Sequence, residues 1–330
     1  MIINYHEKKK LHKNKYIRII ILLLVLINMK IDSEKLLGEY LFCQKCIYDL
    51  NRNKSCSNCS LNIIFQPIKV KSIDETLDEI IKNKKSISRF GNGEFNIIFN
   101  KGIKFQKFNK RLKHKLIEVL NSTLTNLLIG IMKLDDVKNY PFWTNWLNKY
   151  KFSLGKILNK NKIYYNSFIT RFMTLFKNKI NNKKYISKFK TIWNNRNIII
   201  IEGDKTRVGI GNDLFNNTKS IKRIICPNEN AFSVFDKILN YFHTNNIDKK
   251  SLILISLGPT ATILAYELCK LGFQSIDIGH FDLQYEFYLR NVTNVIKIPN
   301  KYVNEISGGS LNIAPVKDNT YYKEILINFS

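Results

Sequence analysis

The second half of the chain alternates short apolar runs with segments of helical spacing. The apolar runs cover 197–203, 221–227, 251–259 and 274–280, and helical patterns follow the middle two at about 229–243 and 260–271. Near-continuous apolar strands separated by helices are typical of a parallel sheet that is covered on both faces. We therefore predict an α/β fold with a mostly parallel sheet and helices on both faces.

The first half of the main domain shows the same elements less regularly. Ser72 is a suitable N-cap for a helix through Ile81, because acidic residues occupy its first turn. The stretch "SISRF" (86–90) reads as a short strand and "NLLIGIM" (126–132) as a buried one. Between them, the segment 108–124 has the apolar spacing of a helix. These elements extend the predicted sheet toward the N-terminus.

The first 66 residues have a different texture. A basic leader precedes an apolar run from Ile19 to Ile27, a polarity that is typical of signal sequences. Spanning a bilayer takes about 20 apolar residues, and even 16–29 falls short unless Arg18 snorkels. We predict a membrane anchor or interfacial helix through 16–29, with an ordinary buried helix as the alternative. The predicted organisation is a leader and anchor at 1–30, a cysteine segment at 31–66 and the main domain at 67–330.

The side of the membrane on which the main domain lies stays open. The basic leader favours a cytoplasmic N-terminus, so a true span would place residues 31–330 on the far side. An interfacial helix would leave them in the cytoplasm. Membrane attachment is thus predicted, but not the compartment.

Six cysteines include two C-x-x-C pairs in the segment 31–66. The pairs can hold one structural Zn²⁺ in a reducing compartment, form two disulfides in an oxidising one, or form no bond at all. Either bond would stabilise a small subdomain. The paired residues are Cys43, Cys46, Cys56 and Cys59, which leaves Cys226 and Cys269 as predicted buried thiols.

The formal net charge of +27 would ordinarily indicate a nucleic-acid, lipid or phosphorylated partner. Lysine, asparagine and isoleucine are abundant along the whole chain, however, so the charge is a general compositional bias and not a focused basic face. We predict no nucleic-acid partner. A basic zinc-ribbon nucleic-acid binder remains a third hypothesis, and it requires binding that depends steeply on salt.

Four loops that follow predicted strands carry the residues suited to chemistry, because ligands of open α/β sheets bind at the carboxyl ends of the strands. "SRFGNGEF" (88–95) has a basic residue and a carboxylate around two glycines, and 202–213 and 258–260 are anion-binding turns. The fourth loop holds three titratable groups within seven residues, one of which can act as a general base. The residues concerned are Arg89, Gly91, Asn92, Gly93 and Glu94; Thr206, Arg207, Gly209, Gly211 and Asn212; Gly258, Pro259 and Thr260; and His280, Asp282 and Glu286.

These loops resemble a known family. The stretches "SRFGNGEF", "IIIEGDKTRVGIGNDLF", "SLGPTATILAYEL", "IDIGHFDLQYEF" and "KYVNEISGG", in this order, are similar to the GT-D-type glycosyltransferases. The resemblance covers residues 68–330 and implies a Rossmann-like sheet and a nucleotide-sugar donor. It implies transfer of a hexose, with glucose from UDP-glucose as the first candidate, to a hydroxyl of a glycan or glycoprotein.

The resemblance also implies site roles. The family's loop reads Asp-Gly-Glu and holds a divalent cation, Mn²⁺ or Mg²⁺, whereas this chain has Asn92-Gly93-Glu94. An amide oxygen can still ligate such a cation, with less charge to hold it. Arg89, Thr206, Arg207 and the turn 258–260 would bind the diphosphate, and Glu286 would be the base, with Asp282 second. Gln284 stands where the family tends to have a glutamate.

The replacement at position 92 keeps a second hypothesis open. In this hypothesis the protein is a catalytically silent relative that binds nucleotide or glycan and serves as an accessory subunit. Asn92→Asp separates the two, since a large gain of activity from near zero would indicate the silent protein.

Overall fold

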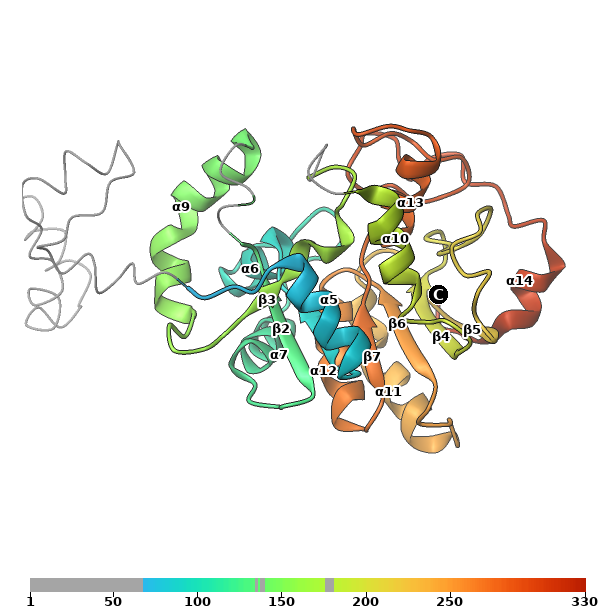
Figure 1. The fold of residues 1–330 in the computed structure, drawn as a ribbon, viewed down its shortest axis with the longest axis horizontal. Helices are drawn as coiled ribbons and strands as arrows, with labels where there is room; N and C mark the ends of the chain where they lie inside the picture. The colour runs from blue at the N-terminus through green and yellow to red at the C-terminus, as the bar shows by residue number, and fades with distance from the viewer. Residues whose placement is uncertain (1–67, 134–135, 137–139, 176–180) are drawn as a thin grey trace, which may run out of the picture. The chain divides into compact units, whose positions relative to one another are not determined.

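The computed structural model describes residues 68–133, 136, 140–175 and 181–330 (Figure 1). The predicted anchor at 16–29 and the cysteine segment at 31–66 lie outside these residues. In the ranges described, no helix is long and apolar enough to cross a membrane.

One sheet organises the described residues, and all of its strand pairs are parallel. The strand order is β3-β2-β1-β7-β6-β4-β5-β8. The strands are β1 Ser86–Arg89, β2 Leu127–Ile131, β3 Tyr165–Asn166, β4 Asn197–Gly203, β5 Ser220–Cys226, β6 Leu252–Ser256, β7 Gln274–Asp277 and β8 Ile325–Asn328. Each strand predicted from the apolar pattern is present, so the parallel α/β prediction is confirmed.

The helices are α5 Ile73–Lys82, α6 Asn92–Ile98, α7 Lys110–Asn121, α9 Pro141–Ile157, α10 Asn182–Lys190, α11 Phe235–Thr244, α12 Pro259–Lys270, α13 Phe281–Leu289 and α14 Asn319–Glu324, with 3₁₀ turns η1 Ser167–Thr170 and η2 Ala231–Val234. Ser72 caps α5 as predicted. Its hydroxyl accepts a hydrogen bond from the Glu75 amide at 3.2 Å, and the Glu75 carboxylate accepts one from the Ser72 amide at 2.8 Å. This reciprocal pair satisfies backbone donors at the helix start.

Apolar side chains cover both faces of the sheet. Successive residues of β4 alternate between them: Ile199 and Ile201 pack with one core cluster, and Ile198 and Ile200 with the other. Buried side chains of α7, α11 and α12 belong to the first cluster, and those of α5, α10 and α13 to the second. The two-layered helical cover that the continuous apolar strands predicted is therefore confirmed (Figure 1).

The strand order brings the predicted loops together. β1, β7, β6 and β4 are consecutive neighbours in the sheet, and parallel strands end at the same edge. The four loops that the sequence marked for chemistry leave these four strands. Residues that are far apart along the chain thus meet at one edge of the sheet. Arg89 and Asp277, for example, are 188 residues apart and are hydrogen-bonded to each other.

Candidate active site

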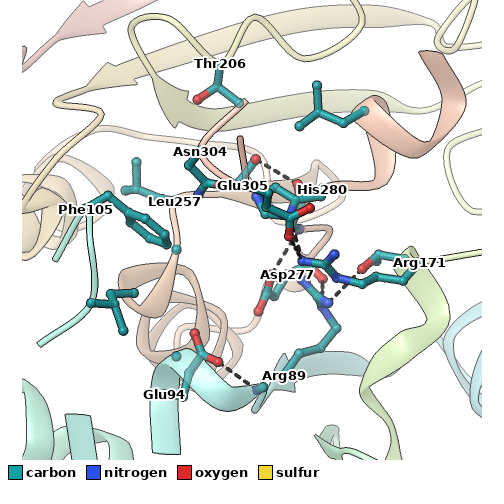
Figure 2. A pocket seen from close by; sticks show the side chains of 18 of the residues that line it. Arg89, Glu94, Phe105, Arg171, Thr206, Leu257, Asp277, His280, Asn304 and Glu305 are labelled. Carbon is teal, nitrogen blue, oxygen red and sulfur yellow. Dashed lines mark hydrogen bonds and ion pairs between the residues drawn. The ribbon is translucent and has the colours of Figure 1, made fainter. Parts of the chain in front are cut away.

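A pocket of about 650 Å³ lies at this edge of the sheet. Its volume is within the range of small-molecule sites. The side chains that line it come from all four loops, and from α9, η1 and the segment 302–305 (Figure 2). The predicted site residues that line it are Arg89, Gly91, Asn92, Gly93, Glu94, Thr206, Gly258, His280 and Asp282.

Other predicted site residues do not line the pocket. They are Arg207, Gly209, Gly211, Asn212, Pro259, Thr260 and Glu286. Several of them shape the loops that do line the pocket, as the contacts below show.

The segment 88–95 is a helix start and not an open loop. Asn92, Gly93 and Glu94 form the first turn of α6, and Gly91 is its N-cap. The Glu94 carboxylate accepts a hydrogen bond from the Gly91 amide at 2.7 Å. This contact holds the Glu94 side chain at the pocket wall.

Arg89 is engaged with the protein itself. Its guanidinium donates to the Asp277 carbonyl at 2.6 Å and to the Asp277 carboxylate at 2.7 Å. The same group donates to the Ser167 carbonyl at 3.0 Å and to the Thr170 hydroxyl at 2.7 Å. Gly279, at φ +44°, leaves room for it, because a Cβ there would lie 2.0 Å from Arg89 Nη2. Arg89 therefore joins β1, β7 and η1 beneath the pocket.

Asp277 is an acidic lining residue that the sequence analysis did not select. It ends β7, its side chain is 4% exposed, and its Oδ1 accepts from Arg89 and from the Gly279 amide at 3.1 Å. Burial raises the pKa of Asp277, against the attraction of Arg89. Burial also raises the pKa of Glu94, and the Asp277 charge adds to that effect. Two carboxyl groups thus face one desolvated space.

His280 belongs to an ion-pair cluster on the pocket wall. Its Nδ1 lies 3.0 Å from Arg171 Nη2 and 3.4 Å from Glu305 Oε1, and Arg171 also pairs with Glu305 (Figure 2). Burial opposes the charge on Glu305, but Arg171 and His280 hold its pKa below the usual value. His280 Nδ1 thus lies between a guanidinium and a carboxylate.

Asp282 and Glu286 share a buried partner, Lys301. Lys301 Nζ lies 2.6 Å from Asp282 Oδ2 and 3.2 Å from Glu286 Oε1. The Asn212 amide donates to both carboxylates, at 2.9 and 2.7 Å, and the Gly209 amide donates to Asp282 Oδ1 at 2.9 Å. These bonds hold the loop 203–213 in place. Both predicted bases are fully engaged with the protein.

The electrostatics of Glu286 differ from those of a general base. Burial disfavours its charge, yet Lys301, Asn212 and Arg290 together lower its pKa below the usual value. A base that works near neutral pH needs a higher affinity for protons than this. Position and charge both indicate that Glu286 stabilises the loop.

Arg207 and Thr260 also point away from the pocket. Arg207, at φ +55°, donates to the Asn300 carbonyl at 2.8 Å and is 7% exposed. Thr260 is fully buried, and within the described residues its hydroxyl has no hydrogen-bond partner. From the predicted anion-binding turns, Gly203, Thr206, Val208 and Gly258 line the pocket.

Gly258 has a positive φ of +55° at the start of α12. A Cβ at this position would lie 2.6 Å from a ring carbon of Phe105, so glycine permits the aromatic ring to approach the helix terminus. The Phe105 backbone is held in turn, since its carbonyl accepts from the Asn230 amide at 2.8 Å. The pocket thus has an aromatic side chain next to a helix N-terminus.

The sequence analysis missed lining residues outside the four loops. Asp277 was assigned to a predicted strand and given no role. A carboxylate at the carboxyl end of a buried strand nevertheless indicates a ligand site, because ligands of open α/β sheets bind there. Glu305 stands in the stretch "KYVNEISGG", which was quoted for the resemblance without a role, and Arg171 stands in the stretch 164–172, "YYNSFITRF". The sequence around Phe105 has no pattern that marks a site residue, so only the folded structure identifies it as a lining residue.

Comparisons with known proteins agree with this architecture. The family described as "Glycosyltransferase GT-D fold" matches residues 87–306. The chain is 34% identical over 269 residues to the glycosyltransferase GlyD of Streptococcus pneumoniae, and 33% identical over 274 residues to the probable glycosyl transferase Gly of Streptococcus gordonii. These matches cover 78% and 80% of this chain but 32% and 39% of the relatives. The chain therefore spans about a third of the length of the curated relatives it matches.

Solved structures give the same result. A glycosyltransferase containing the domain of unknown function 1792, from Streptococcus sanguinis, is 31% identical, with a TM-score of 0.74 over 80% of this chain and 100% of that one. A structure described as the highly conserved domain of unknown function 1792 with a distinct glycosyltransferase fold is 32% identical, with a TM-score of 0.75 over 82% of this chain and 99% of that one.

Proposed function

Because this chain belongs to the glycosyltransferase GT-D fold family, we propose that it transfers a hexose from a nucleotide-sugar donor to a glycan or glycoprotein hydroxyl. The first donor to test is UDP-glucose. The observation that carries the proposal is the polar pocket of about 650 Å³ where the loops after β1, β4, β6 and β7 meet. Its volume suits a nucleotide sugar, and its wall offers backbone donors and carboxylates.

We place the donor diphosphate beside Gly258 and Thr206, which both line the pocket. Gly258 is the N-cap of α12, and the N-terminus of a helix favours an anion. The imidazole of His280 also lines this pocket. These groups would stabilise the charge that develops on the leaving diphosphate.

The cation that the family motif implies fits this site in part. Among the described residues, no group of three or more His, Cys, Asp or Glu side chains is arranged to hold a metal ion. Mg²⁺ and Mn²⁺ in nucleotide enzymes are often held by one or two carboxylates together with phosphate oxygens. Glu94 supplies one carboxylate at the pocket wall, and Asn92 beside it supplies an amide oxygen. When bound, the cation would neutralise part of the diphosphate charge.

The test is a transfer and hydrolysis assay of the full-length chain with a panel of labelled UDP-hexoses and Mn²⁺. Release of UDP with one sugar supports the enzyme and names the donor. If none of the nucleotide sugars binds or turns over, the proposal fails.

The alternative is a catalytically silent relative that binds nucleotide or glycan as an accessory subunit, and Asn92 is the observation that favours it. Asn92→Asp discriminates between the two. A gain of activity from near zero would identify the silent protein, whereas a small change in a measurable rate would identify a working enzyme.

We further propose that residues 16–29 attach the protein to a membrane. The apolar run and its basic leader in the sequence are the support for this.

A further inference from the structure

We propose that Asp277 is the second carboxylate ligand of the divalent cation in this chain and supplies the carboxylate oxygen that Asn92 lacks. This inference rests on the proposed function, since the cation is needed there to bind a diphosphate donor. Asp277 lies 185 residues after Asn92 and is not part of the Asn92-Gly93-Glu94 motif.

Asp277 lies on the strand next to the one that leads into Glu94. β7 pairs with β1 at Ile276 and Ile87, so Asp277 lies one strand away from the residues that lead into α6 and Glu94. Neighbouring strands are about 4.8 Å apart. Figure 2 shows the Glu94 and Asp277 carboxyl groups directed toward the same open space of the pocket.

The Asp277 side chain is held in place through one carboxylate oxygen, and its other oxygen is available to a ligand. Arg89 and the Gly279 amide hold Oδ1, at 2.7 and 3.1 Å. Within the described residues Oδ2 accepts no hydrogen bond, although the residue is 3% exposed. A carboxylate fixed through one oxygen and open at the other has the arrangement of a metal ligand whose outer partners orient it.

Other acidic residues that line the pocket are engaged with neighbouring groups. Asp282 has both oxygens bound, by Lys301, Asn212 and Gly209. Glu305 pairs with Arg171 and contacts His280. Of the lining carboxylates in the described residues, Asp277 is the one on the strand that pairs with β1, and β1 leads into Asn92 and Glu94.

A further observation comes from the same wall. The Ser167 hydroxyl lines the pocket, its residue is 3% exposed, and it has no hydrogen-bond partner within the described residues. A buried polar atom without a partner is costly unless a ligand or water satisfies it. Ser167 also adjoins Arg89, which fixes Asp277, through its carbonyl. Two carboxylates that line one pocket and an unsatisfied hydroxyl are groups that a hydrated cation would satisfy together.

The experiment measures Mn²⁺ affinity by electron paramagnetic resonance on the full-length chain, with and without UDP. Asp277→Asn should weaken Mn²⁺ binding roughly 10- to 100-fold, since losing even an outer partner of a ligand has an effect of that order. The matched control is Glu305→Gln, which removes a charge from the same pocket but from an engaged side chain. We expect it to change the affinity by less than about fivefold.

A rescue variant completes the test. Asn92→Asp combined with Asp277→Asn again provides two carboxylates, so it should regain most of the lost affinity. If Asp277→Asn does not fold, Asn92→Asp alone decides: a gain below about tenfold agrees with an existing second carboxylate, and a gain of about 100-fold or more contradicts it. An affinity unchanged in Asp277→Asn, or lost equally in Glu305→Gln, would overturn the inference.

The outcomes separate this inference from the proposed function. Mn²⁺ binding that depends on Asp277, without binding or turnover of any UDP-sugar, would leave the ligand assignment intact and end the transferase proposal. Turnover of a UDP-sugar with Mn²⁺ affinity independent of Asp277 would do the reverse.

Discussion

Arg89→Met tests whether the arginine of "SRFGNGEF" joins parts of the fold or binds phosphate. Methionine keeps an apolar side chain of similar length and removes every donor. The wild-type guanidinium makes four hydrogen bonds to Asp277, Ser167 and Thr170, at 2.6 to 3.0 Å. Its side chain is 13% exposed and that of Asp277 is 4% exposed. The substitution would therefore leave a buried carboxylate without its counter-charge.

The magnitude follows from that burial. Breaking a buried ion pair by removing one partner costs about 3–5 kcal/mol of unfolding free energy. For a domain of this size, each kcal/mol lowers the melting temperature by roughly 2–4 °C. We expect a decrease on the order of 10 °C.

Urea unfolding of the full-length chain, followed by tryptophan fluorescence, measures the loss. The three tryptophans of the chain, Trp143, Trp146 and Trp193, are all buried in the described residues, so their emission reports on this domain. Arg111→Met is the matched control, because Arg111 pairs with Asp236 at the surface and its side chain is 55% exposed. Its expected cost is below about 1 kcal/mol.

A double variant sharpens the result. Asp277→Asn removes the stranded charge, so Arg89→Met should cost less in that background than in the wild type, by about 1 kcal/mol or more. If Arg89→Met unfolds within about 1 kcal/mol of the wild type, the arginine is not a structural clamp. Its guanidinium would then be available for phosphate, as the sequence suggested.

Four further outcomes are expected. Glu94→Gln should abolish sugar transfer and leave melting within a few degrees of wild type without added cation, because burial already raises the pKa of this carboxyl; retained transfer would exclude Glu94 from the site. Glu286→Gln should lower thermal stability more than the transfer rate of the folded enzyme, and the opposite result would restore Glu286 as the base. The pKa of Glu286 is lowered from its usual value of 4.5, so the stability that its charge contributes is present above pH 4.5 and is lost as the pH falls below it. In Glu286→Gln the free energy of unfolding should therefore fall less steeply with pH below pH 4.5. An unchanged pH dependence of unfolding would contradict this. Full-length protein should sediment with membranes while residues 31–330 stay in the supernatant and bind UDP-sugar; full-length protein found entirely in the supernatant would refute the anchor.

Local physics accounts for what could be read without the structure. Most buried residues of β4, β5 and β6 are apolar on both sides of the sheet, and that preference is visible along the sequence. The start of α5 is equally local, because Ser72 and Glu75 satisfy each other's backbone amides across three positions. Contacts between near neighbours leave a pattern in the chain, so both features were predictable.

Side-chain roles in the pocket were not predictable in this way. Asp282 and Glu286 stand four residues apart on α13 and look equivalent as bases, yet Asp282 lines the pocket and Glu286 does not. That difference depends on Lys301 and Asn212, which arrive from other parts of the chain.

The same reasoning applies to Arg89 and Asp277. As a sequence, "SRFGNGEF" shows a basic residue and a carboxylate around two glycines, which suits a phosphate or metal loop. In the folded chain β1 lies beside β7, and the charge of Arg89 is taken by an aspartate 188 residues away. Residue type and spacing determined that this edge of the sheet would be charged and polar. Which charges neutralise each other and which remain for a ligand was decided by the strand order, because Coulomb attraction and hydrogen bonds depend on distance in space and not along the chain.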